Sequence, residues 1–359
     1  LASGLGMPEE MVLERYLVAK LDEEMPPEVE EHTTRSYALL GLVPGDLELR
    51  ALLLSVYTEQ VAGFYDPDST ALFVLDDMPA ETLRPLLVHE LTHAVQDQAT
   101  DLDSLTHRRR GNDRQVAAQA AIEGHATLVM FEHMTEELQG REVDLSEIPD
   151  FAARVRPALE AMRGQYPALA NAPAIIRESI LFPYIEGAGF VQRLWLDREG
   201  RPAPFRTELP HSTEQVLHPE RFVGPPASRD RPTDVDVSVT GREAVYENGL
   251  GEFETGVFLR ELAGDEAGDA ARGWDGDRFV LLGPEVRDGG SDDDALVWVT
   301  VWDDESARNR FAEALVPALG RLPKPASLDP VTVDGRPAAV LRVGAVGDVR
   351  VGLSEAGGS

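Results

Sequence analysis

The spacing of apolar positions predicts three helices at the start of the chain. Apolar side chains recur every three or four residues after Pro8, after Pro26 and Pro27, and after Pro44. This is the period of a helix with one buried face, and proline is favoured in the first turn of a helix. We therefore predict that residues 1–60 form an N-terminal helical cap packed on the region that follows.

A β-hairpin and then a long helix are predicted next. Residues 63–65 and 71–75 predict two strands around the turn signal Asp66-Pro67-Asp68. The edge of a strand can pair with an extended peptide, so 71–75 is a candidate peptide-binding strand as well as a structural one. The helix extends from about Pro79 to Gln98. We expect its apolar face to be buried, and this face carries Leu87, Val88, Leu91, Ala94 and Val95.

The rest of the chain predicts a mostly helical middle region. Residues 99–113 are polar and residues 264–276 are rich in Gly, Asp and Ala, so we expect a loop and a linker there. Helices are expected at 114–138, at 147–198 with breaks at Pro167, Pro173 and Pro183, at 212–217, and at 240–262 with a break near Gly249 and Gly251.

After the predicted linker, the pattern changes to short apolar runs typical of strands. Strands are expected at 278–282, 295–302, 329–335, 337–343 and 346–353, with one helix at 306–319. The predicted fold class is therefore α+β and mostly helical. Its domains are the cap at 1–60, a catalytic domain at 61–263 and a small C-terminal α+β module at 274–359.

Composition and charge narrow the possible partners. The chain has 359 residues, no cysteine and a formal net charge of −31. Disulfides and thiolate-bound zinc are therefore excluded, and the negative field disfavours nucleic acid and anionic membranes. No apolar run is long enough for a transmembrane helix. Because the sequence begins at Leu1 without a leader, we expect a mature or trimmed form from which a signal peptide could have been removed.

The helix predicted at 79–98 carries the sequence His89-Glu90-Leu91-Thr92-His93. Residues four apart share one face of a helix, so His89 and His93 can hold one metal ion through their imidazole nitrogens. Glu90 lies about 100° round the helix from His89, within reach of a water on that metal. The pattern is the H-E-x-x-H signature of zinc peptidases, in which the glutamate is the general base. The alternative is an ordinary amphipathic helix whose polar face holds two of the chain's 8 histidines.

A third metal ligand has to come from outside this helix. One class of zinc peptidase has a third histidine ten positions after the first and a glycine before it. Ala99 and Gln96 occupy those positions, which excludes that class. Another class takes a glutamate from a following helix, and Glu123 is well placed in the helix predicted at 114–138. His125 is the rival ligand, although on a regular helix it points about 200° away from Glu123.

Several stretches resemble a known family. The string His-Glu-Leu-Thr-His-Ala-Val-Gln-Asp-Gln at 89–98, with Gly-Phe-Tyr-Asp-Pro at 63–67 before it and Glu123-Gly124 after it, resembles a group of prokaryotic gluzincin-like zinc metallopeptidases. The stretches 182–184, 212–219 and 273–278 also resemble landmarks of this group.

The resemblance implies a zincin-like core and one zinc ion bound by two histidines and a glutamate. It also implies an extracellular or cell-envelope location. Gluzincins often place an aspartate four residues after the glutamate ligand, where it orients a metal-binding histidine. Thr127 stands at that position here, so the orienting carboxylate is Asp97 or is missing.

We therefore expect zinc-dependent hydrolysis of peptide bonds in a protein or peptide substrate, with Zn²⁺ as cofactor. Glu90 is the expected general base, and the expected zinc ligands are His89, His93 and Glu123. The candidates for the group that polarises the scissile carbonyl are Tyr184, His211 and His218. The alternatives are a catalytically silent or latent binding protein that keeps the zincin fold, and hydrolysis of a non-peptide amide. The sequence does not indicate an oligomeric state.

Overall fold

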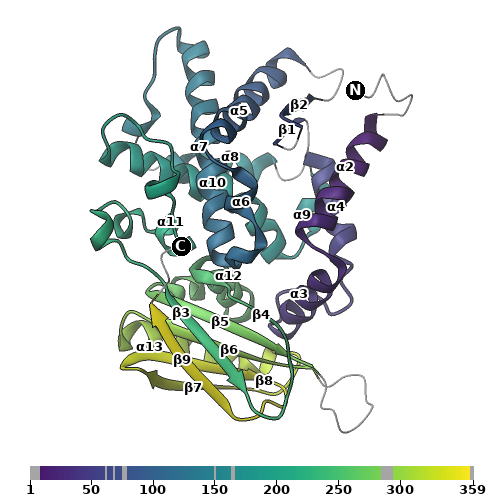
Figure 1. Cartoon of the computed structure of the whole chain (residues 1–359), viewed down its shortest axis with the longest axis vertical. Helices are drawn as coiled ribbons and strands as arrows, with labels where there is room; N and C mark the ends of the chain where they lie inside the picture. The colour runs from purple at the N-terminus through teal and green to yellow at the C-terminus, as the bar shows by residue number, and fades with distance from the viewer. Residues whose placement is uncertain are drawn as a thin grey trace.

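The computed structural model describes residues 9–60, 63–67, 69–74, 79–148, 151–162, 166–283 and 294–355. Within these ranges the protein is α+β and mostly helical, as predicted. The helices form the upper part of the molecule in Figure 1, and the larger sheet forms its base. Among the described residues, no helix is both long and apolar enough to cross a membrane.

The three helices predicted at the start of the chain are present. They are α2 (Glu9–Glu24), α3 (Pro27–Leu39) and α4 (Leu49–Gln60). Helix α2 packs on α4, whereas α3 reaches the strands of the C-terminal sheet. The N-terminal helices therefore pack on one another and, through α3, on the C-terminal sheet.

The predicted hairpin and the long helix after it are also present. Strands β1 (Gly63–Asp66) and β2 (Ala71–Val74) pair antiparallel, with Tyr65 opposite Leu72. Leu75, the last residue of the predicted second strand, lies outside the described residues. Helix α5 (Ala80–Ala99) follows and packs against β1.

The prediction of a polar loop at 99–113 is wrong. This segment forms helix α6 (Leu102–Thr106) and a 3-10 turn at Arg108–Arg110. The Asp101 side chain accepts a hydrogen bond from the backbone N–H of Ser104, and Leu102 is buried. The cap and one apolar anchor are enough to order a single helical turn.

Two long helices form the centre of the molecule. Helix α7 (Asn112–Gln139) contacts α5, and α10 (Ala174–Asp197) lies along α7. The break predicted at Pro183 is wrong, because α10 continues through it. A proline removes one helical hydrogen bond, and here the buried neighbours Phe182 and Ile185 hold the helix in the core. Shorter helices precede α10: α8 (Phe151–Met162) and α9 (Pro167–Asn171).

The segment after α10 differs from its prediction in two places. Helix α11 (Thr213–Leu217) is capped by Ser212, as expected. The helix predicted at 240–262 is a strand, β4 (Ala244–Asn248), followed by helix α12 (Gly251–Ala263). The predicted linker is also wrong, because residues Asp265–Ala271 form a 3-10 helix that packs on α12.

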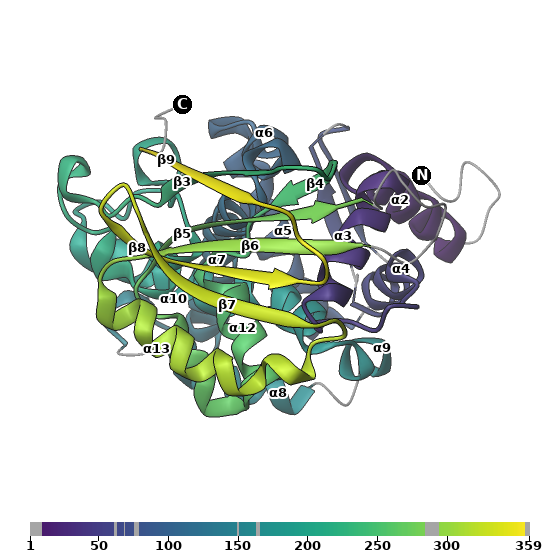
Figure 2. The same cartoon turned by 90° about the horizontal axis from the view of Figure 1, so that it is seen from below.

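The C-terminal strands form one five-stranded antiparallel sheet in the order β4-β5-β6-β8-β7. Its strands lie side by side in Figure 2, and α13 (Glu305–Leu315) runs beside them. A second antiparallel pair joins β3 (Thr233–Val239) to β9. The remaining strands are β5 (Trp274–Leu282), β6 (Ala295–Trp302), β7 (Ala326–Val333), β8 (Arg336–Val343) and β9 (Val349–Glu355).

Both faces of the central strands β5, β6 and β8 are mostly buried. On one face, Val280 and Leu282 pack with Val235 of β3 and with apolar residues of β9. On the other, Phe279 and Leu281 belong to a core that continues through the helices as far as Leu21. The sheet and the helices therefore share one hydrophobic core.

Candidate metal centre

Three potential ligand atoms converge between α5 and α7. His89 and His93 lie on the same face of α5, with their Nε2 atoms 3.0 Å apart. Glu123 of α7 places its Oε2 atom 3.1 Å from Nε2 of His89 and 3.4 Å from Nε2 of His93. The structure thus brings together the three residues that the sequence proposes as ligands.

The spacing of these atoms fits a tetrahedral zinc ion. Ligand atoms about 2.1 Å from such an ion lie about 3.4 Å from one another. Two imidazole nitrogens and one carboxylate oxygen are also a donor set that zinc uses in catalytic sites, with the fourth position left for water or substrate. His89, His93 and Glu123 therefore fit a zinc ion both in chemistry and in size.

The charged groups of this centre shift one another's pKa values. Burial lowers the pKa of His93, but the Glu123 carboxylate outweighs burial and raises this pKa to about 9. Burial alone raises the pKa of Glu123, but His93 and His89 hold it well below its ordinary value. The two imidazoles therefore stabilise the negative charge of a buried carboxylate at this centre.

Glu90 lies beside the ligands and is held by the hairpin. Its Oε2 atom accepts a hydrogen bond of 2.8 Å from the backbone N–H of Tyr65 in β1. Burial raises the pKa of Glu90, and the nearby His93 and His89 oppose this rise. A carboxylate with a raised pKa and a fixed orientation suits a general base.

The expected orienting carboxylate, Asp97, has a different partner. It accepts a hydrogen bond of 2.9 Å from the Tyr65 hydroxyl, so it joins the hairpin to α5. The ring nitrogen Nδ1 of His93 lies instead 2.8 Å from Oε1 of Gln96. Sequence reasoning missed Gln96 in this role, although its position one helical turn after His93 is a signal that could have found it.

The rival ligand His125 lies behind the metal centre. Its Nδ1 atom is 3.0 Å from Nε2 of Gln96, and its ring meets the rings of Trp195 and Phe205 edge to face. Burial lowers its pKa to about 4. His125 is therefore a neutral imidazole in an aromatic environment, and it contacts the centre through Gln96.

A close helix crossing brings Tyr184 to the site. A Cβ atom added to Gly124 of α7 would lie 2.0 Å from the carbonyl carbon of Gly187 in α10, so only glycine lets the two backbones touch. Tyr184, one turn before Gly187, then lies beside His89, with 6.1 Å between the ring centres. The negative charge of Glu123, together with burial, raises the pKa of Tyr184 well above 10. Its hydroxyl is therefore a neutral hydrogen-bond donor.

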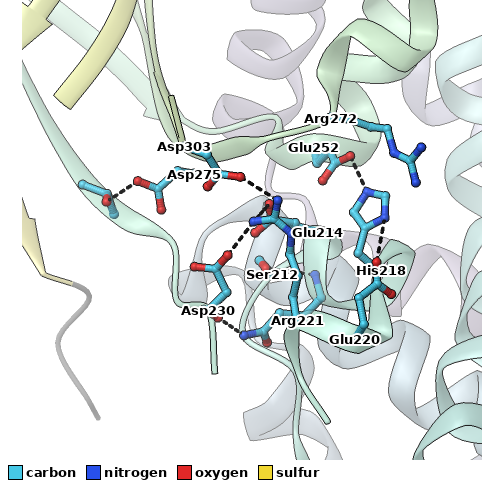
Figure 3. Close-up of polar contacts among 12 residues, drawn as sticks. Ser212, Glu214, His218, Glu220, Arg221, Asp230, Glu252, Arg272, Asp275 and Asp303 are labelled. Atoms are coloured by element: carbon cyan, nitrogen blue, oxygen red, sulfur yellow. Dashed lines mark hydrogen bonds and ion pairs between the residues drawn. The ribbon is translucent and has the colours of Figure 1, made fainter. Parts of the chain in front are cut away.

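The structure gives His218 and His211 other partners. Nε2 of His218 is 2.7 Å from Oε1 of Glu252 in α12, as Figure 3 shows. Both residues line a cavity of about 810 Å³ between α10 and α12, whose walls include none of the three candidate ligands. Burial and four surrounding arginines lower the pKa of His211 to about 4. Of the three candidates for polarising the carbonyl, the structure places Tyr184 at the metal centre.

The buried apolar face predicted for α5 is wrong at Leu91 and Val95, while Leu87, Val88 and Ala94 are half-buried. Leu91 and Val95 are 53% and 64% exposed, whereas His89 and Glu90 are each 8% exposed. The reason is that α7 and β1 pack against the side of α5 that carries the site residues. The polar face of this helix is therefore the buried one.

A second acidic group, Glu214 with Asp230 and Asp303, also has the spacing of a cation site. Figure 3 shows Arg221 between these carboxylates. Its guanidinium pairs with Glu214 at 2.9 Å, with Asp303 at 2.6 Å, and with Asp230. The arginine already occupies the place of a cation, so this group is an ion-pair cluster that joins α11 to the sheet.

Comparison with known proteins gives one match. Residues 238–346 match a domain of unknown function, DUF8575. No curated protein and no solved structure matches the chain. The matched segment covers α12, α13 and most of the sheets, and it contains none of the residues of the metal centre.

Proposed function

We propose that this protein is a zinc-dependent peptidase of the gluzincin type, which hydrolyses peptide bonds in a protein or peptide substrate. The observation that carries the proposal is the convergence of His89, His93 and Glu123 at zinc-ligand spacing, next to the buried carboxylate of Glu90. The hairpin, α5 and α7 would then form a zincin-like core.

The proposed ligands and base divide the chemistry between them. When bound, zinc supplies a Lewis acid and lowers the pKa of a coordinated water to about 7. His89, His93 and Glu123 would hold the ion and leave one position open. Glu90 would take a proton from the attacking water and pass it to the leaving amine, and its raised pKa favours both steps.

Tyr184 is the proposed donor to the developing oxyanion. Its ring stacks at an angle beside His89, and its hydroxyl keeps its proton because the charge of Glu123 opposes ionisation. A neutral hydroxyl can donate a hydrogen bond where negative charge develops on the substrate carbonyl oxygen. Although its hydroxyl group is buried beside Glu123, the residue as a whole is 39% exposed, so part of the side chain is accessible to a substrate.

The hairpin is the proposed support for an extended substrate. In an antiparallel pair, alternate residues turn their backbone groups away from the partner strand. The N–H of Tyr65 points to Glu90 rather than to β2, so the free edge of β1 faces the proposed base. Because β1 has no second strand partner among the described residues, the proposed edge that pairs with substrate is β1 rather than the predicted strand 71–75.

Hydrolysis of casein by the purified chain, with and without a chelator, tests the proposal. We expect cleavage that stops when the chelator removes zinc and returns when zinc is added back. Undiminished cleavage in the chelator, or no cleavage of casein or of a peptide library by the zinc-loaded protein, would favour the alternatives. These are a latent or silent zincin-fold binding protein and an amidase for non-peptide substrates.

The proposed location is extracellular or in the cell envelope. It rests on the resemblance of residues 89–98 and 63–67 to exported peptidases. Fractionation of the producing cells tests it, and recovery of the protein in the cytosol alone would contradict it.

A further inference from the structure

Gln96 is the most deeply buried of the polar residues that surround the metal centre. It is 2% exposed, and its side-chain amide makes three polar contacts, one through the oxygen and two through the nitrogen. Oε1 lies 2.8 Å from Nδ1 of His93. Nε2 lies 3.0 Å from the backbone carbonyl oxygen of Ile122 and 3.0 Å from Nδ1 of His125.

One of these contacts fixes the orientation of the amide. A backbone carbonyl oxygen only accepts hydrogen bonds, so the atom that faces Ile122 must be the NH₂ nitrogen of Gln96. The other end, Oε1, then faces His93 and can only accept. His93 must therefore donate from Nδ1, which leaves the lone pair of Nε2 directed toward His89 and Glu123.

His125 completes the arrangement. The NH₂ group has two hydrogens, and once Ile122 takes one, the other points to Nδ1 of His125, which accepts it. The ring of His125 is itself held between Trp195 of α10 and Phe205. Gln96 thus connects the proposed metal ligand on α5 to α7 directly, and to α10 through His125.

From these contacts we propose that Gln96 is the positioning residue of the metal centre, selecting the tautomer of His93 that can bind zinc. The inference rests on the proposed function, because one of its two tests measures zinc binding. The side chain at position 96 must accept one hydrogen bond and donate two, and an amide can do both. A carboxylate would place oxygen against the Ile122 carbonyl and against Nδ1 of His125, so glutamate cannot replace glutamine here.

Zinc affinity measured by competition with a chelator tests the proposal. We expect Gln96→Ala and Gln96→Glu each to weaken zinc binding about 10- to 100-fold, as loss of the partner of a metal-bound histidine does. Asp97→Asn is the matched control: it is the adjacent residue, and its amide oxygen can still accept from Tyr65, so we expect affinity within threefold of the wild type. Wild-type affinity in Gln96→Ala, or equal losses in Gln96→Ala and Asp97→Asn, would overturn the proposal. So would tighter binding in Gln96→Glu.

A second readout does not depend on zinc or on activity. In the metal-free protein with ¹⁵N-labelled histidine, at a pH above the His93 pKa of about 9 so that the ring is neutral, we expect the His93 signal, assigned by its absence in His93→Ala, to show a proton on Nδ1 and none on Nε2. In Gln96→Ala this preference is expected to disappear, while thermal melting checks that the variant is folded. A proton on Nε2 in the wild type overturns the proposal. If the wild type does not bind zinc, the proposed function is overturned instead. The tautomer of His93 then still tests the role of Gln96.

Discussion

At the scale of single residues, helix α5 buries His89, Glu90 and Gln96 and exposes Leu91 and Val95. Burying polar side chains costs free energy unless they are hydrogen-bonded, and here His93, Glu90 and Gln96 all have partners. A helix under selection for stability alone would bury Leu91 and Val95 instead. The reversed pattern is what a functional site on this helix requires.

The sequence could predict only part of this arrangement. Helix geometry determines the relative directions of His89, Glu90 and His93, so their common face followed from spacing alone. Two partners of Gln96, Ile122 and His125, lie on α7, and no local pattern reveals them. His218 illustrates the same limit, because its partner Glu252 is distant in the sequence.

Replacement of Tyr184 by phenylalanine tests the proposed oxyanion donor. Tyr184→Phe keeps the ring beside His89 but removes the hydroxyl, so we expect kcat to fall by about 10²- to 10³-fold. Zinc content is expected to stay at the wild-type level, because the hydroxyl is not among the three ligands. Hydrolysis at the wild-type rate would show that Tyr184 has no part in the reaction.

At the scale of elements, the crossing of α7 and α10 at Gly124 and Gly187 determines where the site residues lie. A Cβ atom on Gly187 would lie 2.0 Å from the carbonyl oxygen of Ala120. This contact is invisible in the sequence, where Gly187 follows Pro183 in what resembles a helix break. The continuous α10 was mispredicted because burial in the core outweighs local propensity, and β4 because it pairs with the distant strand β5.

Gly187→Ala tests the crossing. The added methyl group must push α7 and α10 apart, and we expect a loss of about 1–3 kcal/mol in the free energy of unfolding. Because the same shift moves Glu123 and Tyr184, zinc affinity is also expected to fall. Gly45→Ala is the control, since nothing lies within 4 Å of its added Cβ. Equal stability of the Gly187 and Gly45 variants, measured by urea unfolding, contradicts the account.

At the scale of the whole molecule, buried carboxylates join the helices to one another and to the sheet. Asp113 of α7 accepts from the backbone N–H of Thr213, and Asp277 of β5 accepts from Leu250 and Gly251 at the start of α12. Glu254 of α12 accepts from the Tyr37 hydroxyl of α3 at 2.8 Å. The predicted linker at 264–276 failed for the same reason: this region is packed into the shared core rather than separating two bodies.

Asp113→Asn tests the effect of these carboxylates on stability. Burial raises the pKa of Asp113 to about 7, whereas an aspartate in the unfolded chain titrates near pH 4. The folded state therefore binds the proton more tightly, so this group stabilises the protein below about pH 4 and its contribution is lost as pH rises to about 7. Each unit of pKa difference corresponds to about 1.4 kcal/mol, so the loss amounts to a few kcal/mol.

The free energy of unfolding in urea at pH 5 and at pH 8 measures this contribution. We expect the decrease from pH 5 to pH 8 to be smaller in Asp113→Asn than in the wild type, because asparagine does not ionise. Asp46→Asn, at an exposed position, is expected to retain the wild-type decrease. The same pH dependence in all three proteins means that Asp113 does not titrate as described.

The central claim is that Glu90 acts as the general base beside a zinc ion. The most direct test compares casein cleavage by the wild type and by Glu90→Gln, with the zinc content of each determined by elemental analysis. The account predicts one zinc per chain in both proteins and a loss of at least about 10²-fold in hydrolysis for the variant. A Glu90→Gln protein that carries zinc and cleaves casein as fast as the wild type would contradict it.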